Sequence, residues 1–213
     1  MLLFAPANAM ILIGMLDSPY VRRVAISMKR MGIAFQHQPL SVFRTFEQFR
    51  AINPVVKAPT LVCDDGTMLM DSTLILDHVE TLVAPERRLM PGDVAGRRAA
   101  LRLIGLALAA ADKTVQMVYE RTQRPPEKRF EPWFDRVQSQ ALASFAELES
   151  AAAMAKPWLQ GDKFNAADLM VAVAWRFGQY YEPEKIRAVA HPALVAFSAR
   201  AEAFPEFAST PLE

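Results

Sequence analysis

Between residues 10 and 30, the apolar residues change from a continuous run to a helical spacing. Residues 10–16 form an unbroken apolar run that is short enough for a buried strand. From Val21 to Met28 the apolar residues recur at helical spacing, which predicts a helix with one buried face and with the Arg22-Arg23 pair off that face, in solvent. Ser18 and Pro19 stand between the two patterns, and proline suits the first helical position. Ser18 is therefore the predicted N-cap.

The next fifty residues alternate between strand and helix patterns. Residues 33–40 alternate apolar and polar positions and predict a strand, and residues 45–52 predict a short helix that stops at Asn53-Pro54. Two short apolar runs flank Asp64-Asp65-Gly66, which is typical of a tight hairpin turn. A helix is predicted to begin at Ser72, with Ser72 as its N-cap. This order predicts a small mixed α/β sheet covered by helices.

Beyond a proline-containing linker at 84–92, the pattern is helical throughout. Long helices are predicted over 95–123 and 130–154, and the sequence Asn165-Ala166-Ala167-Asp168 resembles a capping box that opens a further apolar helix. We assign Asn165 and Asp168 to folding rather than to ligand binding. The chain is expected to form two domains, an α/β domain over 10–84 and an all-α domain over 93–213.

Composition narrows the class of protein. The 213 residues are 52% hydrophobic, enough for a sizeable core, and the formal net charge of +1 gives no sign of a nucleic-acid or membrane partner. Residues 1–5 are apolar but lack a basic region, so we interpret them as a short extension rather than a signal peptide. The single Cys63 cannot form an internal disulfide, fits a cytoplasmic location, and is expected to be a buried, inert thiol.

The junction before the first predicted helix is the first candidate for chemistry. A strand that runs into a helix N-terminus gathers free backbone N–H groups, and these favour an anion such as a thiolate. Ser18 could therefore be only a structural cap, or its hydroxyl could donate to a bound thiolate. The three histidines, His37, His78 and His191, have no metal-ligand spacing, so no metal site is predicted.

Four motifs together resemble the cytosolic glutathione transferases, in particular the bacterial serine type, over almost the whole chain. They are Ser18-Pro19-Tyr20 at the first helix, Asn53-Pro54 with Lys57-Ala58-Pro59-Thr60-Leu61 before the third strand, Asp71-Ser72, and the capping box at Asn165–Asp168. The resemblance implies a thioredoxin-like N-terminal domain, an all-helical C-terminal domain and a cytoplasmic homodimer. It also implies that glutathione is a cosubstrate, with no metal.

The resemblance also implies roles for single residues. The Ser18 hydroxyl would stabilise the glutathione thiolate, which would then attack a small hydrophobic electrophile. Other residues would bind glutathione itself: the backbone of Ala58 before a cis bond to Pro59 would hold the cysteinyl part, Asp71 and Ser72 the γ-glutamyl end, and Lys57 the glycyl carboxylate.

Two departures from the family pattern keep other functions open. Asp17 precedes Ser18, and a carboxylate near a thiolate opposes its ionisation. Ala58 stands where the family usually has valine or isoleucine. A non-catalytic adaptor that binds glutathione or a protein partner is therefore one alternative. A glutathione-dependent isomerase or peroxidase is another, although isomerases on maleylacetoacetate-like substrates carry Ser-Ser-Cys where this chain has Asp17-Ser18-Pro19.

The electrophile pocket is expected between the two halves, opposite the sulfur. Its candidate residues share one face of the first long helix, with Tyr20 added from the first domain: Lys113, Gln116, Met117 and Glu120. The alternative is that Met117 packs in the core while Lys113 and Glu120 lie in solvent.

Overall fold

The computed structural model describes residues 9–212, and their contacts divide them into two units. The sheet unit comprises the residues up to Leu89 and those from Pro205 onward, and the helical unit comprises Met90–Phe204. The sequence-based prediction places residues 93–213 in the helical half, whereas the residues from Pro205 onward have most of their contacts with the sheet unit. The apolar residues 1–5 lie outside the described range.

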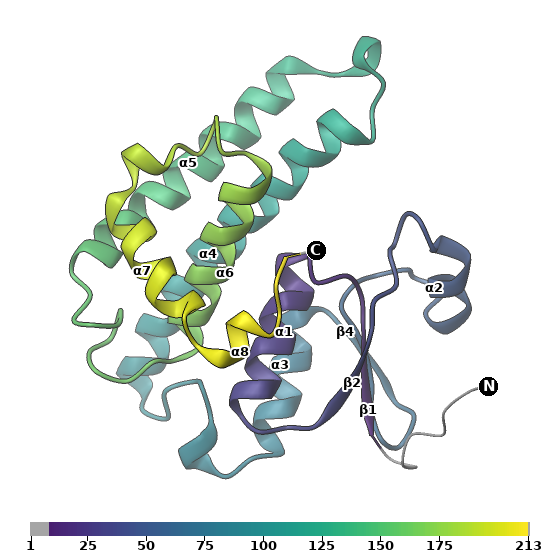
Figure 1. The fold of residues 1–213 in the computed structure, drawn as a ribbon, viewed down its shortest axis with the longest axis vertical. Helices are drawn as coiled ribbons and strands as arrows, with labels where there is room; N and C mark the ends of the chain where they lie inside the picture. The colour runs from purple at the N-terminus through teal and green to yellow at the C-terminus, as the bar shows by residue number, and fades with distance from the viewer. Residues whose placement is uncertain (1–8, 213) are drawn as a thin grey trace. The chain divides into compact units, whose positions relative to one another are not determined.

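A four-stranded mixed sheet forms the centre of the sheet unit (Figure 1). The strands are β1 (Met10–Ile13), β2 (Phe35–Gln38), β3 (Thr60–Val62) and β4 (Met68–Met70), in the order β2-β1-β3-β4. β1 pairs in parallel with β2, whereas the β1–β3 and β3–β4 pairs are antiparallel. A parallel pair needs a crossover connection, and here the predicted first helix provides it.

Helices cover both faces of this sheet. α1 (Pro19–Arg30) and α3 (Ser72–Thr81) pack against each other on one face, and α2 (Phe46–Ile52) lies on the other (Figure 1). α1 ends before Gly32, whose φ of +69° is the left-handed conformation that glycine supplies at a helix C-terminus. Residues Pro85–Arg87 in the predicted linker form a single 3₁₀ turn, η1.

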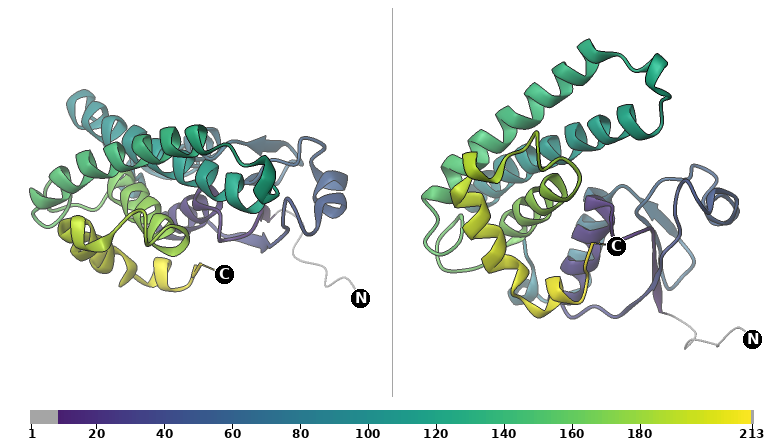
Figure 2. Two further views of the ribbon diagram at one scale, coloured as in Figure 1. Left: turned by 90° about the horizontal axis from the view of Figure 1, so that it is seen from above. Right: turned by 45° about the horizontal axis from the view of Figure 1, so that its top comes forward.

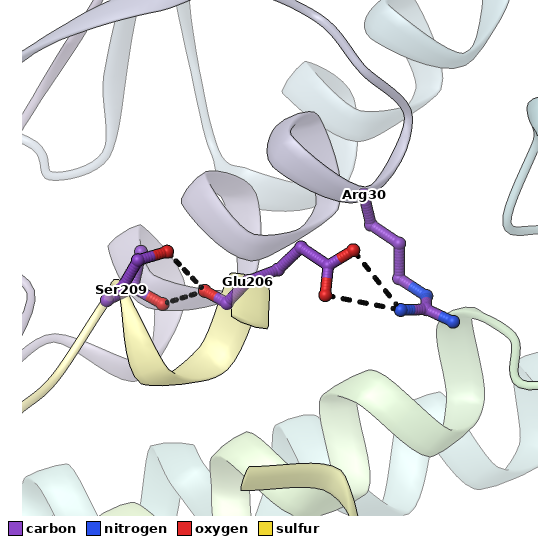
Figure 3. A network of polar contacts seen from close by, with 4 residues as sticks. Arg30, Glu206 and Ser209 are labelled. Carbon is purple, nitrogen blue, oxygen red and sulfur yellow. Dashed lines mark hydrogen bonds and ion pairs between the residues drawn. The ribbon is translucent and has the colours of Figure 1, made fainter. Parts of the chain in front are cut away.

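The last helix, α8 (Pro205–Ala208), packs on α1. Arg22 is almost fully buried there: its Nε donates to the Thr210 carbonyl at 2.8 Å, and its guanidinium lies over the Phe207 ring, 5.6 Å from the centroid. Nearer the end of α1, Arg30 pairs with Glu206 at 3.4 Å (Figure 3). The prediction of a solvated Arg22 was therefore wrong, because the returning chain covers it.

The helical unit is built on a long antiparallel helix pair, α4 (Val94–Thr122) and α5 (Glu131–Ala153) (Figure 2). α6 (Ala166–Tyr181) packs on α4, and α7 (Pro192–Glu202) packs on both α5 and α6. Two 3₁₀ turns, η2 (Pro126–Lys128) and η3 (Ala188–Ala190), occur in the connections. Within residues 9–212, no helix is long and apolar enough to cross a membrane.

The predicted capping box is confirmed at the start of α6. The Asn165 side chain accepts from the Ala167 N–H at 2.8 Å, and Asp168 Oδ2 accepts from the Asn165 N–H at 2.9 Å. The other oxygen of Asp168 accepts from the Leu159 N–H at 2.8 Å, so the same carboxylate also fixes the loop before the helix. Asp168 is 0% exposed, in agreement with its assignment to folding.

Candidate functional site

The junction between β1 and α1 has the local geometry that the sequence predicts. Ser18 is the N-cap of α1, and its Oγ accepts from the Val21 N–H at 3.4 Å. This contact uses the hydroxyl oxygen only as an acceptor, so the hydroxyl hydrogen stays available for a second partner. Ser18 is half-buried at the positive end of a twelve-residue helix. The cap and the proposed thiolate contact are therefore compatible.

The loop before β3 lies against this junction. A Cβ atom placed on Gly14, which has a φ of +137°, would lie 3.1 Å from Ala58 Cβ and 2.6 Å from Val21 Cγ2. Ala58 therefore packs beside the strand end and the first turn of α1. The Ala58–Pro59 peptide bond is cis, as the family resemblance implies. Lys57 precedes it with an exposed side chain.

A buried amide that the sequence analysis did not single out for a role supports the same loop. Asn53 Nδ2 donates to Thr60 Oγ1 at 2.8 Å, and Asn53 Oδ1 accepts from the Val55 N–H at 3.0 Å. The Thr60 hydroxyl in turn donates to the Lys57 carbonyl at 2.7 Å. In the sequence, Asn53 marks a helix stop and belongs to the motif before the third strand, but an Asn-Pro pair does not show which hydroxyl the amide binds.

The N-terminus of α3 differs in detail from the prediction. Asp71, not Ser72, is the N-cap: its Oδ1 accepts from the Thr73 N–H at 2.8 Å. Asp71 has a φ of +70°, a conformation that aspartate tolerates better than most side chains. Ser72 becomes the first residue of the helix and is buried. Ser72 therefore presents its hydroxyl and its N–H together in the first turn, where N–H groups lack partners within the helix.

Arg23 connects α1 to this helix end. Its Nη1 donates to Ser72 Oγ at 3.2 Å and is 3.4 Å from Thr73 Oγ1. Arg23 is only 4% exposed, so its predicted place in solvent was wrong. Burial lowers the pKa of Arg23 to about 10, although the nearby Asp71 favours its charged form. Helical spacing located the neighbouring apolar face but could not show that α3 packs over Arg23.

The candidate electrophile residues on α4 have partners inside the helical unit. Met117 is 0% exposed in a core cluster with Phe134, Val137 and Ala141. This agrees with the alternative that Met117 packs in the core rather than lining a pocket. Glu120 is buried rather than in solvent.

The polar candidates on α4 also have local partners. Glu120 accepts from the Phe130 N–H at 2.9 Å and pairs with Arg124 at 2.9 Å. Lys113 and Gln116 both contact Asp112, at 2.9 and 2.8 Å, and they remain half-exposed. Tyr20 is a half-buried residue of α1.

The histidines and the cysteine have separate, local contacts. His37 Nε2 lies 2.8 Å from the Gly14 carbonyl, and His191 Nδ1 lies 2.9 Å from the Arg187 carbonyl. His78 Nε2 lies 3.9 Å from Cys63 Sγ. Burial raises the pKa of the Cys63 thiol. In the part of the chain that the structure describes, no three His, Cys, Asp or Glu residues are grouped so that they could hold a metal ion.

Both halves of the chain match models of one family. Residues 12–87 match the glutathione S-transferase N-terminal domain, and residues 111–205 match the glutathione S-transferase C-terminal domain. The chain belongs to the glutathione S-transferase family. The mixed sheet followed by a mostly helical unit is the fold of that family.

Solved structures and a curated relative agree with this assignment. A glutathione S-transferase from Methylobacterium radiotolerans, in complex with glutathione sulfonate, is 29% identical, with a TM-score of 0.87 over 95% of this chain and 94% of its own. A glutathione transferase family member from Pseudomonas fluorescens Pf-5 with bound glutathione is 29% identical, with a TM-score of 0.84 over 96% and 100%. The maleylacetoacetate isomerase of Pseudomonas aeruginosa PAO1 is 26% identical over 83% of this chain and 88% of its own.

Proposed function

We propose that this family member binds glutathione in the sheet unit and transfers its thiolate to a small hydrophobic electrophile. Ser18 would donate its hydroxyl hydrogen to the glutathione sulfur and lower the pKa of the thiol. The backbone of Ala58 would hold the cysteinyl part of glutathione, and Lys57 its glycyl carboxylate. The helix end at Asp71 and Ser72 would bind the γ-glutamyl group.

One observation carries this proposal: three separate segments meet around the first two turns of α1. Ala58 packs beside Gly14 at the start of the helix, and Ser72 accepts a hydrogen bond from Arg23 one turn further on. The half-buried Ser18 hydroxyl lies at the same helix end. A tripeptide has its carboxylates, thiol and backbone spread along its length, so a site for it needs donors from several segments in one place.

The deciding experiment follows the ultraviolet absorbance of the thiolate of bound glutathione as a function of pH. For the wild type, we expect ionisation well below the usual thiol pKa of about 8.5. Ser18→Ala should restore a pKa near that of free glutathione and reduce the conjugation rate by roughly 10²-fold or more, by analogy with the loss of one oxyanion donor. Glutathione affinity should change little, because Ser18 contacts only the sulfur. Ser139→Ala, at an exposed serine of α5, is the matched control.

Different outcomes separate the candidate functions. Binding of glutathione without a lowered thiol pKa would contradict the enzyme proposal and favour an adaptor. Equal ionisation by wild type and Ser18→Ala would remove the role of Ser18. Absence of binding would contradict the whole proposal.

Isomerisation is a second candidate, supported by the similarity to the Pseudomonas aeruginosa maleylacetoacetate isomerase. It would use the same thiolate as a nucleophile that adds to the substrate and leaves again. The two activities are distinguished by incubating the protein with glutathione and either a chlorodinitrobenzene or a cis-dienoic diketo acid. Conjugation consumes glutathione, whereas isomerisation leaves its concentration unchanged.

The pocket for the electrophile is proposed on the half-exposed face of α4 that carries Lys113 and Gln116. Met117 and Glu120 have less support, because they are buried by partners of their own. We also propose a homodimer, which sedimentation of the purified protein would test.

A further inference from the structure

Arg23 has an environment that a purely structural arginine seldom has. Its guanidinium is nearly inaccessible to solvent, yet its Nε has no hydrogen-bond partner among the described residues. Its Nη1 hydrogen bonds go to the hydroxyls of Ser72 and Thr73, which are neutral acceptors. Buried cations are normally paired with anions, since an unpaired charge in a protein interior is costly. The first two residues of α3 thus sit on a buried positive charge.

The contact with Arg23 fixes which way the two hydroxyls can donate. A guanidinium carries only donors, so Ser72 Oγ and Thr73 Oγ1 must act as acceptors toward it. Their own hydrogens are consequently directed away from Arg23. Among the described residues, the hydrogen bonds of the two hydroxyls are those that they accept from Arg23, so their own hydrogens can be donated to a ligand. The helix end therefore presents donors backed by a full positive charge.

We propose that Arg23 is a positioning residue for the α-carboxylate of the γ-glutamyl group of glutathione. It holds the Ser72 and Thr73 hydroxyls as donors toward that carboxylate and supplies the positive charge beneath them. The proposal rests on the proposed glutathione site at α3 and adds to it a residue from α1. Asp71, whose charge acts on Arg23, is the acidic group that remains for the γ-glutamyl ammonium.

This role is tested by comparing how wild type and an Arg23 variant bind glutathione and an analogue that lacks the α-carboxylate. Calorimetry would measure the dissociation constants of glutathione and of 4-aminobutanoyl-Cys-Gly, which lacks only that carboxylate, for wild type and Arg23→Gln. We expect Arg23→Gln to weaken glutathione binding about tenfold or more, the range of a charge-assisted hydrogen bond. The same substitution should weaken binding of the analogue less than about twofold. Arg30→Gln, at a half-buried arginine of the same helix, should leave both constants unchanged.

The comparison separates positioning from support of the fold. If Arg23 merely joined α1 to α3, its loss would weaken both ligands by the same factor, and the proposal would be overturned. Should Arg23→Gln not fold, Arg23→Lys carries the same comparison, because it keeps the charge but loses the planar guanidinium whose Nη1 contacts both hydroxyls. It should show a smaller loss confined to glutathione.

The wild type also gives a test that needs no variant. If the wild type binds both ligands equally well, Arg23 is not a carboxylate-positioning residue, while the glutathione site itself stands. If the wild type binds neither ligand, both the proposed function and this inference fail.

Discussion

Replacing Asp168 should strongly destabilise the helical unit. Its two oxygens accept from the backbone N–H groups of Asn165 and Leu159, and the carboxylate itself is inaccessible to solvent. Asp168→Ala leaves both donors without that acceptor. Asp168→Asn keeps one carbonyl oxygen and can satisfy only one of them.

The expected cost follows from these two hydrogen bonds. An unsatisfied buried donor costs about 1–3 kcal/mol, so Asp168→Ala should lower the free energy of unfolding by roughly 2–6 kcal/mol. Asp168→Asn should cost about half as much. Such values are a large part of the roughly 5–15 kcal/mol that stabilises a typical protein.

Urea unfolding followed by tryptophan fluorescence measures this directly. All three tryptophans, at positions 133, 158 and 175, lie in the helical unit, and Trp158 precedes Leu159. With a urea slope of about 1–3 kcal/mol per molar, a loss of roughly 2–6 kcal/mol should lower the midpoint for Asp168→Ala by at least about 0.7 M. Asp162→Ala, at an exposed aspartate of the same loop, should leave the midpoint unchanged.

The comparison of variants decides whether the reasoning holds. Equal losses in Asp168→Ala and Asp168→Asn would mean that the number of satisfied donors does not set the cost. A loss below about 0.5 kcal/mol in both variants would refute the argument from burial, because that is the range of ordinary surface substitutions.

Three further predictions concern single buried positions. Because burial raises the pKa of Cys63, its alkylation should be slow in the folded protein and accelerate sharply in denaturant; fast labelling of the native state would contradict its burial. Burial also raises the pKa of Glu182, against the opposing effect of its ion pair with Arg121. The contribution of this residue to stability should then fall as pH rises from the ordinary glutamate pKa through the raised one, and Glu182→Gln should flatten that pH dependence in urea unfolding. Gly14→Ala should lower the melting temperature by several degrees, because its Cβ would lie 2.6 Å from a side-chain carbon at a φ of +137°. Gly105→Ala, in open space on α4, should not lower it.

Local patterns were sufficient for several features that depend on neighbours in the sequence. Ser18-Pro19 predicts the cap of α1, Asp64-Asp65-Gly66 predicts the β3–β4 hairpin, and Asn165 with Asp168 predicts the capping box. In each of these features, the interacting groups lie within a few residues of one another. The cis bond before Pro59 came instead from the family resemblance, since spacing alone cannot predict it.

Contacts between segments that are far apart in the sequence could not be predicted from local patterns. Arg22 and Arg23 are two adjacent charged residues, which are usually exposed to solvent. They are buried because α8 packs on α1 over Arg22 and α3 packs on α1 over Arg23. The cap of α3 is a local exception: Asp71 and Ser72 both have side chains that can cap a helix, and it is Asp71 that accepts from the Thr73 N–H. The sequence singled out Ser18 and Ser72 as candidate site residues, but it did not single out Arg23, which contacts Ser72.

The return of the chain to α1 sets an order on how the protein is made. The Arg22 side chain emerges early, but the Thr210 carbonyl that it binds is synthesised 188 positions later. At about 5–20 residues per second, that interval is roughly 10–40 s. Throughout it, the sheet unit lacks the Thr210 carbonyl and the Phe207 ring that contact Arg22 in the complete fold. The sheet unit, whose synthesis begins first, is therefore completed last, after the whole helical unit has left the ribosome. A fragment that ends at the linker would lack α8 permanently.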